Sequence, residues 1–328
     1  MQLFEGGELI DRLPVQLKEV NRVEILTLMD NYVDVLLRST DVVTRPPLAK
    51  GLDLPTDTLL AEHGLSMLVM AYQGKEKHTV LFDTGHSPVG VPHNIELLEV
   101  NLDEVEALVL SHGHMDHTGS LSTVLDRIAK PIPLVVHPDA FVSPRYFGLD
   151  DGRKLKFPRT LVKADLQDRK VELVVSKTPT LLAHDLVAVT GEVERVTEFE
   201  KGLPNAVLER NGKLVKDPIA DDQSLVLNLK GKGLVVLSGC AHAGIINTIL
   251  HARKITGIRK VHAVIGGFHL SGPFFEPIIE ETIRELKEME PAVIVPMHCT
   301  GWKAIERFSQ EFPASFILNS VGSRFTLS

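Results

Sequence analysis

Short apolar runs alternate with amphipathic stretches along most of the chain, a pattern typical of an α/β protein. A buried strand is predicted over 107–110, where all four residues are apolar. The stretch 120–130 predicts a helix, because apolar side chains recur at helical spacing at Leu121, Val124, Leu125 and Ile128. We therefore expect a strand that passes through a short turn into a helix.

Further strands are predicted wherever a short apolar run ends at a turn signal. They cover 23–29, 62–72, 78–82, 133–136, 169–175, 186–189, 224–229, 234–237, 261–265, 292–296, 316–319 and 324–327. Glycine-containing turns at 74–77 and 231–233 predict two hairpins. Helices are expected after Gly244, over 275–289 and after Trp302.

Composition narrows the class of protein. The 328 residues are 44% hydrophobic, which is enough for a sizeable core in one large or two small domains. The net charge of -8 argues against general nucleic-acid binding, but it is compatible with a small anionic substrate held by a metal. We see no signal peptide and no apolar run long enough for a membrane span. With two cysteines, Cys240 and Cys299, we expect no disulfide scaffold and a cytoplasmic location.

The turn between the strand at 107–110 and the helix at 120–130 carries the candidate chemistry. Residues 111–119 read SHGHMDHTG, so three histidines and one aspartate fall within six positions. His112 and His114 can face one point, and Asp116 and His117 a second point nearby. Imidazole and carboxylate suit zinc, iron or manganese. The alternative is a His-rich surface turn without metal, but burying several imidazoles together without a shared cation is costly.

This stretch matches the His-x-His-x-Asp-His signature of the metallo-β-lactamase-fold superfamily, and the chain resembles that superfamily. The resemblance implies an α/β fold, a four-layer αββα sandwich of two mixed sheets flanked by helices. It extends from about residue 23 to the C-terminus, which implies a single domain over 1–328 with an N-terminal extension at 1–22. The motifs at 221–224, 239–244, 266–270 and 298–301 look like a subfamily often labelled dihydropterin-ribofuranosyl-aminobenzene-phosphate synthase-like.

Several histidines share one kind of position, where a predicted strand ends and a helix or loop begins. In a layered α/β protein such strand ends gather at one edge, where ligands bind. The histidines with this placement are His112, His114, His242, His269 and His298.

The resemblance implies two metal ions, which we expect to be zinc, with iron and manganese left open. The first would be held by His112, His114 and His242, and the second by Asp116, His117 and His298.

The chain departs from the family pattern at one point. Many dinuclear members end the strand before their last ligand with an aspartate that bridges the metals. Here that strand ends at Cys240, so the bridge is absent or is replaced by Cys240 or Asp222. A buried free cysteine is otherwise a small apolar residue.

Asp83 ends the strand 78–82, upstream of the histidine cluster. In the family such an aspartate supports the site by hydrogen bonding, because a carboxylate fixes the orientation and tautomer of a ligand imidazole. The alternative is a turn aspartate that caps the following residues.

The function that the resemblance implies is that of an enzyme, a metal-dependent hydrolase. A metal-bound hydroxide would attack a small ester, phosphodiester or lactone. Asp116 would orient the nucleophile, and His269 would contact the substrate or leaving group unless it is a structural histidine. Two alternatives stay open: a pterin-related synthase with metal-assisted pyrophosphate departure, and a non-hydrolytic iron protein for redox or sensing. The expected partner is a small molecule, and a homo-oligomer is compatible with the sequence.

The segment from about 139 to 222 is long for a connection inside a compact domain, so we predict an insertion or lid near the active site. Basic and aromatic residues meet at 144–147 and 153–159. The alternative for most of these basic residues is a solvated surface.

Overall fold

A computed structural model describes residues 14–49 and 51–328 of the chain. The predicted N-terminal extension at 1–22 therefore lies largely outside the described residues, which begin at Pro14. Within this part of the chain, strands form two large sheets and one small sheet.

The first large sheet contains eight strands of the described chain. In spatial order they are β10 (Val171–Val175), β7 (Ile132–Val136), β6 (Val105–Val109), β5 (Glu76–Phe82), β4 (Ser66–Gln73), β2 (Arg22–Met29), β19 (Arg324–Leu327) and β3 (Val43–Thr44). The sheet is mixed, because β5, β6, β7 and β10 pair in parallel and the other pairs are antiparallel.

The second large sheet contains seven of the described strands. Six follow in the order β11 (Thr180–Leu182), β12 (Val187–Val189), β15 (Ser224–Leu229), β16 (Gly233–Ser238), β17 (Val261–Gly267) and β18 (Val293–Met297). The seventh, β1 (Glu19–Val20), pairs with β15. This sheet is also mixed, since β16, β17 and β18 run parallel while β15 and β16 form an antiparallel hairpin.

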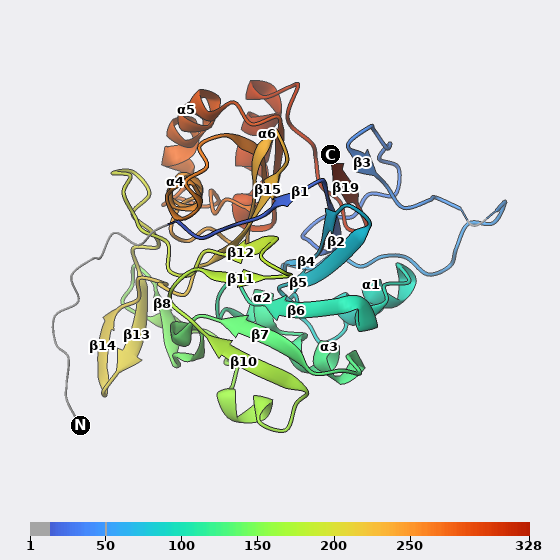
Figure 1. Cartoon of the computed structure of the whole chain (residues 1–328). Coiled ribbons are helices and arrows are strands. Elements are labelled where there is room, and N and C mark those ends of the chain that lie inside the picture. The colour runs from blue at the N-terminus through green and yellow to red at the C-terminus, as the bar shows by residue number, and fades with distance from the viewer. Residues whose placement is uncertain (1–13, 50) are drawn as a thin grey trace.

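Helices cover the outer faces of the two large sheets (Figure 1). They are α1 (Gly90–Leu97), α3 (Leu121–Arg127), α4 (Ile245–Thr256), α5 (Ile279–Met289) and α6 (Trp302–Glu311), whereas the short α2 (Met115–Thr118) carries site residues. One apolar core lies between the sheets and joins side chains such as Phe82 and Leu237. A second core packs α1 and α3 on the first sheet, and a third packs α4, α5 and α6 on the second. The predicted αββα sandwich of two mixed sheets is confirmed.

Five strands of the two sheets end next to a predicted site residue. On the first sheet, β5 ends before Asp83, and β6 ends before the turn at 111–117. On the second sheet, β16 is followed by Cys240 and His242, β17 by His269, and β18 by His298. The topology therefore brings distant parts of the chain to one edge of the sandwich.

The segment 139–222, predicted as an insertion or lid, is distributed over all three sheets. It supplies β10 to the first sheet, and β11 and β12 to the second. The remaining strands form the small sheet, in the order β14 (Lys213–Lys216), β13 (Ala206–Arg210), β8 (Arg145–Gly148) and β9 (Lys154–Lys156). Only this small sheet stands apart from the sandwich, so it is the part of the segment that can cover a site.

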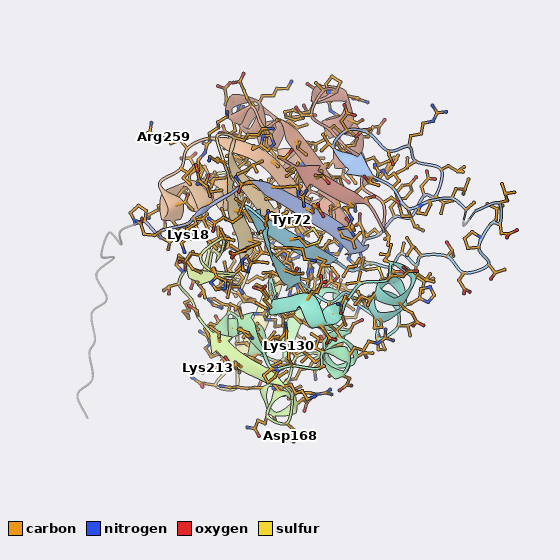
Figure 2. All side chains as sticks on the ribbon, turned by 45° about the vertical axis from the view of Figure 1, so that its right-hand side comes forward. Lys18, Tyr72, Lys130, Asp168, Lys213 and Arg259 are labelled. Carbon is orange, nitrogen blue, oxygen red and sulfur yellow. The ribbon has the colours of Figure 1, made fainter. Side chains whose placement is uncertain are left out.

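Charged side chains lie at the periphery, as Figure 2 shows for Lys18, Lys130, Asp168, Lys213 and Arg259, all of which are exposed. None of the helices in the described part of the chain is long and apolar enough to cross a membrane. The strand predicted over 316–319 is reduced to an isolated bridge between Phe316 and Ile294.

Candidate metal centre

The turn from β6 into α2 is shaped by close contacts of its backbone. A side chain at Gly113 would place its Cβ 2.2 Å from the carbonyl oxygen of Ala140, so only glycine fits there. The Gly113 N–H donates to Asp221 Oδ2 at 2.8 Å, and Asp221 in turn binds the Arg145 guanidinium. This anchor holds the backbone between His112 and His114, and so directs both imidazoles.

The first ligand group is formed by His112, His114 and His242, all of which are buried. His112 Nε2 lies 3.0 Å from His114 Nδ1 and 3.2 Å from His242 Nε2. Burial lowers the pKa of His114 to about 4 and holds the pKa values of His112 and His242 well below their usual range. Three neutral imidazoles that turn ring nitrogens toward one point are the donor set that a divalent transition metal requires.

The second ligand group contains Asp116, His117, Cys240 and His298. Asp116 Oδ2 lies 3.6 Å from His117 Nε2 and 3.3 Å from His298 Nε2. The buried His298 Nε2 approaches this oxygen without the geometry of a hydrogen bond. A buried ring nitrogen without a hydrogen bond is costly unless another group, such as a cation, occupies its lone pair. The residues of both groups therefore fit the metals that the resemblance implies.

Asp83 orients His117. Its Oδ2 lies 2.6 Å from His117 Nδ1, and its Oδ1 accepts the Ser111 N–H at 2.6 Å. The opposite nitrogen of His117, Nε2, then faces the second group, 3.1 Å from Cys240 Sγ. Burial alone would lower the pKa of His117, but the carboxylates of Asp83 and Asp116 raise it to about 9. The contact is the one expected of a carboxylate that fixes a ligand imidazole.

Asp30 and Asn31, which the sequence did not single out, hold His298. Asp30 Oδ1 accepts the His298 N–H at 2.9 Å, and Asn31 Oδ1 lies 3.2 Å from His298 Nδ1. Both residues directly follow β2, so the sequence feature that could have identified them is a pair of polar residues at the end of a strand.

His63, which was not among the predicted site residues, also joins the site. Its ring stacks on His298 with centroids 4.9 Å apart, and its Nε2 lies 3.6 Å from Asp116 Oδ2. The His63 side chain is 60% exposed, so it links the buried carboxylate to solvent.

Asp222 was one of the two candidates for the missing bridge. It lies outside the ligand groups found among the described residues, whereas Cys240 belongs to two of them. Asp222 Oδ2 accepts the Ala243 N–H at 2.8 Å, and burial raises the pKa of this carboxyl to about 6. Its contact is therefore with the loop that carries His242.

His269 lies among other rings rather than at an open surface. Its ring centroid is 4.3 Å from that of His242 and 4.5 Å from that of Phe275. It forms a third group with Cys240 and Cys299, and Cys299 was not among the site residues predicted from the sequence.

The small sheet reaches the first group through two residues. Phe157, just after β9, stacks on His114 with centroids 4.7 Å apart and an interplanar angle of 4°. Arg145 of β8 is buried and binds Asp221 through both carboxylate oxygens, at 2.6 and 3.1 Å. One face of the histidine cluster is thus covered by this sheet.

Comparison with known proteins agrees with this geometry. The metallo-beta-lactamase superfamily pattern matches residues 63–196. The 7,8-dihydropterin-6-methyl-4-(beta-D-ribofuranosyl)-aminobenzene-5'-phosphate synthase of Methanocaldococcus jannaschii is 35% identical over 265 residues, which cover 78% of this chain and 87% of that protein. An uncharacterized protein of the same organism is 32% identical over 254 residues, which cover 76% of this chain and 88% of that protein. A metal-dependent hydrolase of the beta-lactamase superfamily with a crystal structure is 25% identical in sequence. The two structures superpose with a TM-score of 0.68 over 93% of this chain and 98% of the other.

Proposed function

The chain belongs to the metallo-beta-lactamase superfamily, and from that premise we propose that it is a metal-dependent hydrolase of small esters, phosphodiesters or lactones. The observation that carries the proposal is the pair of adjoining ligand groups, His112, His114 and His242 beside Asp116, His117, Cys240 and His298. The chemistry that divalent cations supply when bound there is Lewis acidity, which acidifies water toward a pKa of about 7 and polarises a substrate oxygen.

Asp116 is the residue proposed to orient the attacking water. Burial alone would raise the pKa of Asp116, but the surrounding imidazoles of His117 and His298 hold it well below its usual range. The carboxylate is therefore ionised and can orient an attacking water through Oδ2. In hydrolysis the water oxygen bonds to carbon or phosphorus, the bond to the leaving oxygen breaks, and that oxygen takes up a proton. His63 Nε2, 3.6 Å from Asp116 Oδ2, can exchange the proton with solvent.

A cavity of about 220 Å³ beside His298 is proposed to bind the part of the substrate that does not react. Apolar side chains wall it, including Tyr32, Trp302, Ile305 and Leu318, and Asn31 supplies a polar edge. Trp302 is 69% exposed although it is the single tryptophan of the chain. Exposed aromatic rings around a concave site stack well on a flat or apolar substrate portion.

The small sheet, which contacts the first ligand group at His114, is proposed to determine substrate choice. Phe157 stacks on His114, and the basic side chains of the neighbouring residues 153–159 are exposed. Replacing 153–159 with a short Gly-Ser turn should change the ratio of kcat/KM values between substrates while leaving metal content unchanged. Loss of metal or of folding would instead make this segment part of the core.

A second function, a pterin-related synthase, is favoured by one observation. The relative with that activity is 35% identical across 87% of its length. Departure of pyrophosphate from a pterin diphosphate, with an arylamine as nucleophile, would use the same ligand groups to stabilise negative charge on the leaving group.

The two functions separate in one assay series. Purified chain reloaded with zinc, iron(II) or manganese(II) would be tested on an ester, a phosphodiester and a lactone, and on a pterin diphosphate with an arylamine. Metal-dependent release of acid or alcohol that is lost in His114→Ala supports hydrolysis. Condensation without hydrolysis of the first three substrates would replace the hydrolase proposal with the synthase.

A further inference from the structure

The two cysteines of the chain meet a histidine at the ends of three neighbouring strands. Cys240 follows β16, His269 follows β17 and Cys299 follows β18, and these strands pair in parallel side by side. One ligand atom from each of the three residues lies within 4.8 Å of the others. We propose that Cys240, Cys299 and His269 form a third metal-binding group, which takes a soft divalent cation such as Zn²⁺ and shares the Cys240 sulfur with the second group.

The local backbone leaves room for this group. A Cβ at Gly267 would lie 2.6 Å from Cys299 Sγ and 2.4 Å from the Gly239 carbonyl oxygen, so glycine is needed to admit the sulfur. His269 adopts a left-handed backbone with φ 49°, a conformation that costs a non-glycine residue about 1–3 kcal/mol. The fold holds the imidazole against the two cysteines in spite of that cost.

The side chains have few other partners. Cys240 and Cys299 are buried free cysteines, and the Cys299 thiol makes a weak contact of 3.4 Å with the Cys240 carbonyl oxygen. His269 Nδ1 is buried and has no hydrogen-bond partner within the described residues. Simple packing of two small apolar cysteines would not account for a half-buried imidazole that offers a ring nitrogen to them. A disulfide between the cysteines would leave the imidazole equally unexplained.

The donor set selects the class of cation. Two thiolates and one imidazole favour Zn²⁺, Cd²⁺ or Fe²⁺ over Mn²⁺ and Mg²⁺, which prefer oxygen ligands. Binding replaces thiol protons: two leave when the second group is empty, and one leaves, from Cys299, when a cation in the second group has already made Cys240 a thiolate. Cys240 Sγ lies 3.1 Å from His117 Nε2, so the same sulfur also borders the second group. The third group therefore adjoins the site of the proposed reaction through Cys240, but no step of that reaction requires a cation in it.

Cobalt(II) substitution tests the proposal, because sulfur-to-cobalt charge transfer absorbs in the near ultraviolet and reports thiolate ligands directly. Metal-free wild type, Cys299→Ser and Cys240→Ser would be titrated with Co²⁺, with His251→Gln as a buried histidine control on α4. The wild type should bind about three equivalents, and Cys299→Ser about one fewer. The sulfur absorption should fall by about two-thirds in Cys299→Ser, vanish in Cys240→Ser and persist in His251→Gln.

Equal cobalt uptake and equal absorption in wild type and Cys299→Ser would overturn the proposal. A disulfide between the two cysteines in freshly purified, unreduced protein would also overturn it. If a variant fails to fold, X-ray absorption of the zinc-loaded wild type tests the proposal without any substitution. If the third group binds zinc, the average over all bound zinc ions should be about one sulfur ligand per zinc, at ~2.3 Å. An average of about half a sulfur per zinc or less would mean that only the second group has a thiolate ligand. None of these readouts depends on turnover, so failure of the hydrolase proposal is detected separately.

Discussion

The two sheets contribute to the site in different ways. The first sheet gives His112, His114, Asp116 and His117 from one turn, and none of the residues 111–117 has a left-handed backbone. The second sheet gives His242, His269 and His298 from three separate turns. At each of these turns a non-glycine residue is left-handed, namely Ala241, His269 and His298, with φ values of 52°, 49° and 52°.

The difference shows two ways of building one centre. Ligands that share a turn are fixed by hydrogen bonds between that turn and carboxylates of other segments, such as Asp83 and Asp221, and no residue of the turn is left-handed. Ligands from separate strands depend on sheet register and on backbone strain that surrounding contacts must offset. We expect substitutions in the two halves to have equal effects on metal binding but unequal effects on stability.

The largest effect is expected from removing one ligand in either half. His114→Ala and His242→Ala should both lose the first-group metal and lower turnover at least about a thousandfold, because Lewis-acid stabilisation contributes several kcal/mol. Metal analysis and kcat/KM on the best substrate measure this. Full metal content in His242→Ala would break the comparison, since the second sheet would then contribute no ligand.

Asp116→Asn should keep the fold but lower turnover about a hundredfold or more, because a positioned acid–base group is lost. The circular dichroism spectrum and kcat would be compared with those of Asp103→Asn, an exposed aspartate on the η1 turn (Leu102–Glu104). Near-normal turnover would show that another group orients the nucleophile.

A smaller effect is expected from the carboxylates that support the ligands. Asp83→Asn should weaken metal affinity about 10–100-fold, because it disturbs the hydrogen bond that orients His117. Asp222→Asn should change affinity less, since its amide oxygen can still accept the Ala243 N–H. Competition with a chromophoric chelator measures the metal affinity of both variants. A larger loss of affinity in Asp222→Asn than in Asp83→Asn would contradict the role given to Asp83.

The smallest effect separates strain from packing on the second sheet. Ala241 and Ala243 are each 2% exposed, but only Ala241 is left-handed. Ala241→Gly should therefore be more stable than Ala243→Gly by about 1–2 kcal/mol, the cost of a left-handed L-residue. Urea unfolding of both metal-free variants tests this, and equal midpoints would show that no strain is stored at Ala241.

The first half of the site was the easier one to predict from sequence, because its ligands lie within six positions. His242, His269 and His298 were also singled out, since each follows an apolar strand at a glycine-containing turn. The alternation of apolar runs and amphipathic stretches indicated an α/β protein, and the resemblance to the superfamily implied the four-layer sandwich.

Other features could not be predicted, because they depend on contacts between distant segments. His63 meets Asp116, and Phe157 meets His114, only after the strands have paired. Cys299 meets Cys240 through the order of β16, β17 and β18. The segment 139–222 looked like one insertion because its short strands carry weak signals, whereas three of them complete the large sheets.

The most direct test of the account is a zinc titration of the metal-free chain, with turnover followed at each addition. The two halves together should bind at least about two equivalents tightly, and turnover should be absent without metal and rise as these sites fill. Full turnover in the metal-free chain, or no tight uptake of zinc, iron(II) or manganese(II), would contradict the central claim that both sheets together form a metal-dependent active site.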